Sequence, residues 1–344
     1  MKTVKTIIFL VFIFAFSVFN KDIIIEDNEL DSFIHSKPYS KMDEGEKASF
    51  IKQINSILQN KAKKGIIYKD ELGKIYTNSY YEFELYSKSE TSQSEPGYVE
   101  YSLDASPFTI YSNPISIKEQ GNHKLIYRSV DGLKNYEKDT TLDIIVDKTP
   151  PALDVDMDGK QYTHKDMCFF KPGAKLNIRA KDDIAGLKTI IVNTNREGYK
   201  PLSSENDTFN ENGEYIIYVR AIDKVLNITN EFKYFFIIDG INPTVKLRMG
   251  PDMQDIKGET YCIKDSKVYL EAEDEGSGVY KIEYSLDQGK SWSIYKGSFQ
   301  IKNDPEFQIS YRAFDNLGNV SEVQEFRCKI DSTPPSSKIK PNVK

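Results

Sequence analysis

Tryptophan, histidine and cysteine are scarce in this chain, which has one Trp, three His and three Cys in 344 residues. The histidines, His35, His123 and His164, are too far apart for the spacing of a zinc-ligand pair. No glycine–serine nucleophile elbow and no phosphate-binding loop occurs. We therefore expect a protein that is not an enzyme, with no catalytic residue, no cofactor and no metal site.

An excess of positive charge is also lacking. Lys and Arg together number 46 against 52 Asp and Glu, which gives a formal net charge of -6. A surface that binds nucleic acid needs clustered Lys and Arg, so nucleic acid is excluded as the main partner. With 39% hydrophobic and 28% charged residues, the composition is that of a globular protein.

Long hydrophobic runs are confined to the N-terminus. A short basic stretch, 1–5, precedes the apolar run 6–19, and this pattern predicts a signal peptide over residues 1–20. The small residues Ala15 and Ser17 suit cleavage before Val18, and cleavage near Phe19 and Asn20 is an alternative. An uncleaved N-terminal anchor is the other interpretation. No later stretch approaches the ~20 apolar residues of a membrane-spanning helix, so no span is expected after cleavage.

The sequence repeats itself with a period of 92 residues, since Asp147, Asp239 and Asp331 occupy the same place in one recurring motif. Three markers share this spacing: VDKTPP at 146–151, IDGINP at 238–243 and IDSTPP at 330–335; RxxDxxxN from Arg128, Arg220 and Arg312; and AxDxxxG from Ala180 and Ala272. Three markers with one spacing indicate a tandem array of a single structural unit.

The third unit shows the pattern of short strands most clearly. Val268, Leu270 and Ala272 alternate with Tyr269 and Glu271, as in a half-buried strand. Seven strands are expected, at about 244–249, 267–273, 279–285, 291–295, 298–302, 307–314 and 321–330. Seven strands in about 90 residues predict an immunoglobulin-like (Ig-like) antiparallel sandwich. The expected fold class is all-β, with three tandem Ig-like sandwiches and a short N-terminal helical segment.

Proline-containing motifs mark the expected boundaries between units. The predicted organisation is a signal peptide at 1–20, a polar segment with an amphipathic helix at 21–68, Ig-like repeats at 69–148, 149–240 and 241–335, and a C-terminal tail at 336–344. Proline lacks an N–H and fixes φ, so it ends one strand ladder and stiffens the entry to the next unit. Short stiff linkers favour an extended arrangement of the repeats.

The helix is predicted over 44–64, with Gly65 as its stop. Its apolar residues fall on one face: Phe50, Ile51, Ile54, Ile57 and Leu58. We expect this face to pack on the first sandwich. Docking on a membrane or on a partner is the alternative.

The first and third units share further motifs at residue level. These are YSLD at 101–104, YRSVD at 127–131 and VDKTPP at 146–151 in the first unit, and YSLD at 284–287, YRAFDN at 311–316 and DSTPP at 331–335 in the third. Over residues 75–335 the chain resembles the Ig-like repeat family of leptospiral and other spirochaetal outer-membrane proteins of the OmpL type. The middle unit departs from this pattern, with NTNR at 193–196 in place of the YSLD hairpin.

The resemblance implies an Ig-like fold, export to the outer membrane or the cell surface, and no catalysis. Some members of such families are discussed as adhesins for host matrix. The family carries no catalytic motif that could be transferred to this chain.

One acidic motif imitates the start of a calcium loop, Asp154-x-Asp156-x-Asp158-Gly159. Position 12 of such a loop needs a bidentate acid, and here it is Lys165. One period later, Lys246 and Arg248 replace the first two aspartates while the apolar residues between them persist. The motif is therefore interpreted as a strand with one solvated face.

The recurring arginine–aspartate pairs receive a structural interpretation as well: Arg128 with Asp131, Arg220 with Asp223, and Arg312 with Asp315. Features that recur in every unit usually serve the fold. We expect the Asp to accept backbone N–H bonds in a turn and the Arg stem to cover apolar strand surface.

The three cysteines are Cys168, Cys262 and Cys328, and an exported protein can form disulfides. Cys262 is placed between the first two strands of the third unit and Cys328 late in its last strand. Both would lie near the same pole of an Ig-like sandwich, so they are the candidate disulfide, with Cys168 free.

The expected function is that of an exported cell-envelope protein, associated with the outer membrane, on the cell surface or in the periplasm. It would bind a macromolecular partner, a protein or a glycan, as a surface-associated adhesion module. One alternative is a periplasmic structural or assembly component. Another is a carbohydrate-binding module, for which Trp292, matched by Phe108 in the first unit, is the single Trp platform.

Overall fold

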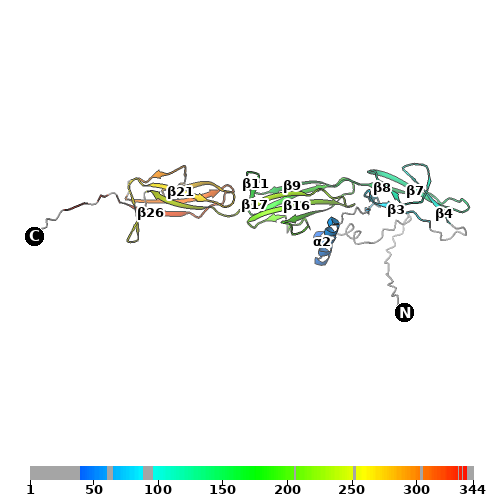
Figure 1. Cartoon of the computed structure of the whole chain (residues 1–344), viewed down its shortest axis with the longest axis horizontal. Coiled ribbons are helices and arrows are strands. Elements are labelled where there is room, and N and C mark those ends of the chain that lie inside the picture. Colours follow the sequence, from blue (N-terminus) through cyan, green and yellow to red (C-terminus); the bar gives the residue numbers. More distant parts are fainter. Residues whose placement is uncertain are drawn as a thin grey trace, which may run out of the picture. The chain divides into compact units, whose positions relative to one another are not determined.

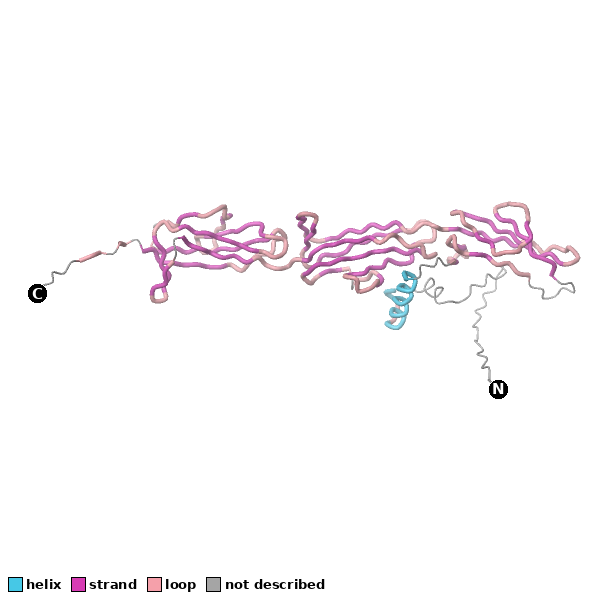
Figure 2. The backbone as a smooth tube through the Cα atoms, viewed as in Figure 1, coloured by secondary structure: helices cyan, strands magenta, loops and turns pink. Residues whose placement is uncertain are grey.

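A computed structural model describes residues 39–59, 65–87, 96–204, 207–250, 253–302, 305–331, 333–334 and 336–338. The predicted signal peptide and residues 339–344 of the predicted tail lie outside this set. Strands dominate the described chain, and one α-helix precedes them (Figure 2). The fold is all-β and made of Ig-like sandwiches, so the predicted fold class is confirmed.

The chain forms two compact units. One contains the first repeat up to Thr149, together with Lys224–Leu226. The other contains the helix, the rest of the second repeat and the whole third repeat. The predicted boundary of the first repeat at residue 69 coincides with the last residue of β1 (Ile67–Lys69).

The first repeat contains eight strands among the described residues. They are β1, β2 (Ile75–Thr77), β3 (Glu82–Phe83), β4 (Pro96–Leu103), β5 (Thr109–Ile110), β6 (Ile115–Ser116), β7 (Gly121–Asp131) and β8 (Thr140–Val146). The larger sheet has the order β1-β2-β8-β7-β4-β5, and β3 pairs with β6. The buried core between them includes Phe83, Leu125 and Ile144.

The second repeat contains nine strands in its described part. They are β9 (Ala152–Asp158), β10 (Gln161–His164), β11 (Met167–Phe170), β12 (Ala174–Lys181), β13 (Leu187–Thr194), β14 (Lys200–Pro201), β15 (Thr208–Phe209), β16 (Gly213–Asp223) and β17 (Phe232–Ile238). The larger sheet has the order β10-β11-β17-β16-β13-β14 and the smaller β15-β12-β9. Its core is rich in aromatic rings, with Phe170 and Phe209 each in contact with Phe236.

The third repeat has the same plan. Its described strands are β18 (Thr244–Gly250), β19 (Gln254–Ile256), β20 (Glu259–Ile263), β21 (Lys267–Glu273), β22 (Val279–Ser285), β23 (Ser293–Ile294), β24 (Phe299–Gln300), β25 (Glu306–Asp315) and β26 (Gln324–Asp331). The larger sheet runs β19-β20-β26-β25-β22-β23 and faces the smaller one, β18-β21-β24 (Figure 1). Val268, Ile309 and Ala313 are fully buried between the two.

Each larger sheet begins, at one edge, with a short hairpin that was not predicted from the sequence. Its second strand runs parallel to the last strand of the repeat: β2 to β8, β11 to β17 and β20 to β26. Seven strands were expected in the third repeat, and the hairpin β19–β20 brings the described number to nine. Short, partly polar strands leave little signal in a local pattern, and a parallel pairing between distant segments leaves none.

The predicted helix is present as α2 (Glu44–Gln59), and residues 60–64 of the predicted range lie outside the described set. Asp43 and Glu46 exchange backbone-to-carboxylate bonds at its start, a reciprocal N-terminal cap. Ile54 is fully buried, as expected for the apolar face. The helix belongs to the unit of the second and third repeats and not to the first, contrary to expectation, because an apolar stripe does not specify which sandwich it covers. None of the described helices is long and apolar enough to span a lipid bilayer.

Candidate functional site

The calcium-loop-like motif forms ordinary strand. Asp154, Asp156 and Asp158 lie on β9, and Asp154 pairs across the sheet with Arg179 at 2.7 Å. Alternate residues of this strand face solvent. The interpretation as a strand with a solvated face is confirmed.

The recurring Arg–Asp pairs separate in the fold, because residues three apart on a strand point to opposite faces. The Arg312 guanidinium binds Glu283, at 2.8 Å and 3.0 Å, and not Asp315. Asp315 instead accepts from the backbone and the side chain of Asn319. The expected role of the aspartate in a turn is confirmed, and the guanidinium of Arg312 lies over aromatic rings.

The outer face of repeat 3 is the solvent side of the strands β22, β23 and β25. The Arg312 guanidinium lies 4.1 Å from the Trp292 ring and 5.0 Å from the Phe314 ring. Ile294, opposite Glu283 across the sheet, is 53% exposed beside them. Stacked arginine and aromatic groups are attracted through the ring quadrupole, which favours this arrangement of the side chains.

Glu283 anchors the outer face of repeat 3 electrostatically. It accepts from Lys281 at 2.6 Å and from Arg312. Burial alone would raise the pKa of Glu283, but the hydrogen bonds from these two cations outweigh it and lower that pKa below its usual value. The carboxylate is therefore ionised at neutral pH and holds both cations in place.

The outer face of repeat 1 carries a similar cluster on β4, β5 and β7. Arg128 lies 4.0 Å from the ring of Phe108 and 4.7 Å from that of Tyr136, and it binds Glu100 at 2.6 Å. Phe108 and Tyr136 are both exposed. The first and third repeats therefore share an arginine between two rings, held by a carboxylate on the neighbouring strand.

The second repeat departs from this pattern. Arg220 lies 5.9 Å from the ring of Tyr199 and pairs with Glu231 at 3.3 Å. Ile191 lies opposite Arg220 on β13, where the other repeats have glutamate. Burial and the hydrogen bond to Glu231 raise the pKa of Tyr199 to about 12, so its hydroxyl stays protonated.

A second arrangement, not predicted from the sequence, is the acidic triad of Asp239, Asp274 and Asp315. Asp239 follows β17, Asp274 follows β21 and Asp315 ends β25. One carboxylate oxygen of each lies within 4.8 Å of an oxygen of each other member. Asp239 and Asp315 are only 2% and 1% exposed.

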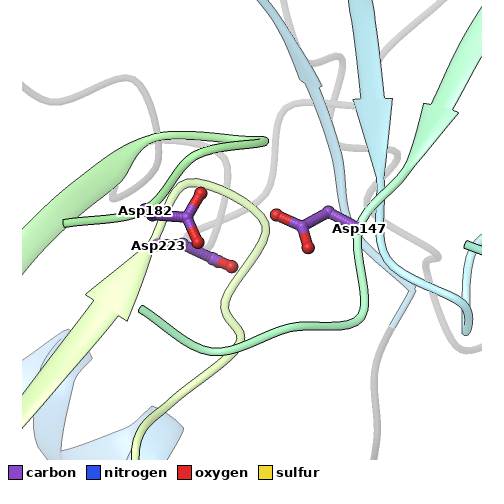
Figure 3. A group of neighbouring side chains, drawn as sticks. All are labelled: Asp147, Asp182 and Asp223. Carbon is purple, nitrogen blue, oxygen red and sulfur yellow. The ribbon is translucent and has the colours of Figure 1, made fainter. Parts of the chain in front are cut away.

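The same three positions are acidic one period earlier, as Asp147, Asp182 and Asp223. Figure 3 shows Asp182 and Asp223 at the ends of their strands, with their carboxylates close together. Asp147 ends the first repeat and accepts from the backbone N–H of Thr149 at 3.0 Å, as Asp239 accepts from Ile241 at 3.1 Å.

These aspartates were visible in the sequence as markers of the repeat, and only Asp223 and Asp315 among them were interpreted as parts of the fold. The hydrogen bonds to their turns agree with that interpretation. The sequence could not show that the ends of three strands, up to 76 residues apart (315 − 239), converge at one pole of the sandwich. An informative signal was available, since acids recur at all three positions in successive units.

The two cysteines of the candidate disulfide are joined in the structure, with their Cα atoms 6.1 Å apart, and Cys168 is free. Cys262 lies within β20, and not between strands as expected. This strand runs beside β26, which carries Cys328. The parallel hairpin strand is therefore what brings the two thiols together.

No protein-family profile and no curated protein matches the chain. Among solved structures, the fibronectin(III)-like modules of Clostridium thermocellum CbhA match 55% of this chain and 100% of their own, at 13% identity and a TM-score of 0.27. A bacterial ice-binding adhesin matches 70% and 88%, at 11% identity and a TM-score of 0.28. Drosophila N-cadherin EC1-4 matches 74% and 70%, at 13% identity and a TM-score of 0.19.

Proposed function

We propose that the chain is an exported binding module of the cell envelope, and that it contacts a macromolecular partner through the outer faces of its first and third repeats. The observation that carries the proposal is the arginine held between two rings, present on both faces. Arg, Trp and Tyr are the residues that most often dominate the energy of protein interfaces. The ring contacts and the ion pairs restrict these side chains before binding, which reduces the side-chain entropy lost on contact.

The physical character of the outer faces favours a protein partner over a glycan. One ring face of Trp292 is covered by Arg312, which leaves at most the opposite face for stacking on a sugar. Arg312 and Lys281 share the single carboxylate of Glu283, so the cluster combines apolar contact area with a small excess of positive charge. The exposed Ile294 extends this apolar area.

Replacement of Trp292 is expected to weaken partner binding. Trp292→Ala removes the ring that Arg312 stacks on and should lower affinity by about tenfold or more, as for a typical interface anchor. Trp292→Phe should retain most of the affinity, because phenylalanine stands at the equivalent position 108 of the first repeat. Solid-phase binding of the purified chain to a panel of matrix and serum proteins measures this difference.

The matched control is Ile256→Ser, an exposed apolar position on the hairpin at the far edge of the same sheet, which should leave binding unchanged. Failure of the wild-type chain to bind any panel member at micromolar concentration would count against the adhesion role. Proteolysis on intact cells tests the location. Resistance of the chain to added protease would favour a periplasmic structural component instead.

A further inference from the structure

The acidic triad combines burial with like charge. Its three carboxylates converge within 4.8 Å, and two of them are almost fully buried. No lysine, arginine or histidine of the described residues forms an ion pair with any member. Two lysines approach the turn that follows Asp315: Lys171 donates to the backbone carbonyl of Gly318 at 3.4 Å, and Lys160 Nζ lies 2.6 Å from where a Cβ on Gly318 would stand. Converging buried carboxylates repel one another unless a proton or a cation lies between them.

Backbone N–H groups satisfy only part of the triad. Asp239 Oδ2 accepts from Ser277 at 2.7 Å, and Asp274 Oδ2 accepts from Gly278 at 2.7 Å. Asp315 has both oxygens bound by Asn319 at 2.6 Å. Each carboxylate oxygen can accept two contacts, so lone pairs remain on every member of the triad.

Two buried polar atoms at the triad have no partner. Asp274 Oδ1 is shielded from solvent and has no hydrogen-bond donor. Ser277 Oγ is in the same state, on a residue only 6% exposed whose N–H binds Asp239. A carboxylate oxygen can only accept, so this buried one needs a donor, a water molecule or a cation beside it.

The loop between β21 and β22 is shaped around the Asp239 carboxylate. Gly276 lies so close to that carboxylate that a Cβ at this position would overlap it. The N–H groups of Gly276 and Gly278 both turn toward Asp274. The loop therefore wraps two of the acids, with a glycine where a side chain would fill the space.

We propose that Asp239, Asp274 and Asp315 bind a calcium ion, which fastens the end of the second repeat to the third. Calcium prefers carboxylate and carbonyl oxygens at about 2.3–2.6 Å, and two ligands on opposite sides of such an ion are about 4.8 Å apart. Three carboxylates within that distance fit one ion. Asp239 belongs to the end of the second repeat and the other two acids to the third, so the ion would bridge the linker.

Calcium is favoured over magnesium by the donors present. The acids are held by short hydrogen bonds to their own turns, so they cannot rearrange freely into an ideal octahedron. Magnesium demands that geometry, whereas calcium accepts irregular sets of six to eight oxygens. Water molecules and backbone carbonyls can complete such a set. The proposal is independent of partner binding by the outer faces, and either can fail without the other.

Hydrogen exchange of the purified full chain, with EDTA or with calcium, tests the site directly. The probes are the amides of Ser277, Gly278 and Asn319, which bind the triad. If the ion binds only the closed loop, calcium at about 100 times its Kd should slow their exchange by about 100-fold. Magnesium at the same concentration should have a much weaker effect.

Asp274→Asn tests the assignment to the triad. It keeps the side chain's shape and an oxygen that can accept from Gly278, but removes one negative charge. The variant should fold. In EDTA its amides should exchange as in the wild type or more slowly, because like-charge repulsion is relieved. It should lose the calcium response. Asp154→Asn, on the solvated face of β9, should keep that response in full.

The outcomes separate clearly. Calcium-independent exchange at these amides in the wild-type chain would overturn the proposal, as would a calcium response retained by Asp274→Asn. Protection by magnesium but not by calcium would overturn the choice of ion. Loss of the response only in Asp274→Asn would establish the site.

Discussion

Phe236→Ala is expected to lower the free energy of unfolding of the second repeat by about 3–5 kcal/mol, because it empties the centre of an aromatic core. Phe236, on β17, is fully buried. Its ring lies 4.9 Å from Phe209, 5.5 Å from Tyr215, 5.7 Å from Tyr234 and 5.9 Å from Phe170. Rigid rings on all sides cannot collapse into the cavity, so little of the loss is recovered.

Chemical denaturation followed by tyrosine fluorescence measures this effect. The control, Phe232→Ala, truncates the same residue type on the same strand, where the side chain is 37% exposed. It should change stability by about 0.5 kcal/mol or less. Equal effects of the two substitutions would mean that Phe236 is not at the centre of a packed sandwich.

Removal of the disulfide, by Cys262→Ser with Cys328→Ser, should lower the stability of the third repeat by about 2–4 kcal/mol. The two cysteines are 66 residues apart, and a bridge that closes so long a loop strongly restricts the unfolded chain. The bridge also ties the hairpin strand β20 to β26. Thermal unfolding with and without reductant measures the loss, and reductant should no longer affect the double variant.

The control for the disulfide is Cys168→Ser, because this free thiol is only partly buried and bridges nothing. Its substitution should leave the response to reductant intact. Mass spectrometry of the oxidised chain should find one free thiol, at Cys168. Three free thiols would show that the disulfide between Cys262 and Cys328 does not form.

Much of the fold could be predicted from the repeat, because the 92-residue period and the alternating strands reflect local chemistry. Turn aspartates, strand stripes such as Val268 to Ala272 and the amphipathic helix are properties of neighbouring residues. The hairpins that open each larger sheet were missed, because their parallel pairing with the last strand depends on the whole topology. The sequence shows which residues alternate but not which distant strand ends meet.

The acidic triad was missed for the same reason. Asp239, Asp274 and Asp315 were each recognised as repeat markers, yet their convergence depends on three strands that end at one pole.

The outer faces were predicted only in part. Arg312 was expected to cover apolar surface, and it does so against Trp292 and Phe314. Its carboxylate partner, Glu283, lies on a neighbouring strand. The spacing of residues along the chain does not show that these two strands pair.

The central claim is that one sandwich is built three times, each around the strand pair at the middle of its larger sheet. Hydrogen exchange over the whole chain tests this most directly. We expect the slowest amides on β7 and β8, β16 and β17, and β25 and β26, and fast exchange at the edge strands β5, β14 and β23. Protection that failed to recur at the 92-residue spacing, or that was strongest at those edges, would contradict the account.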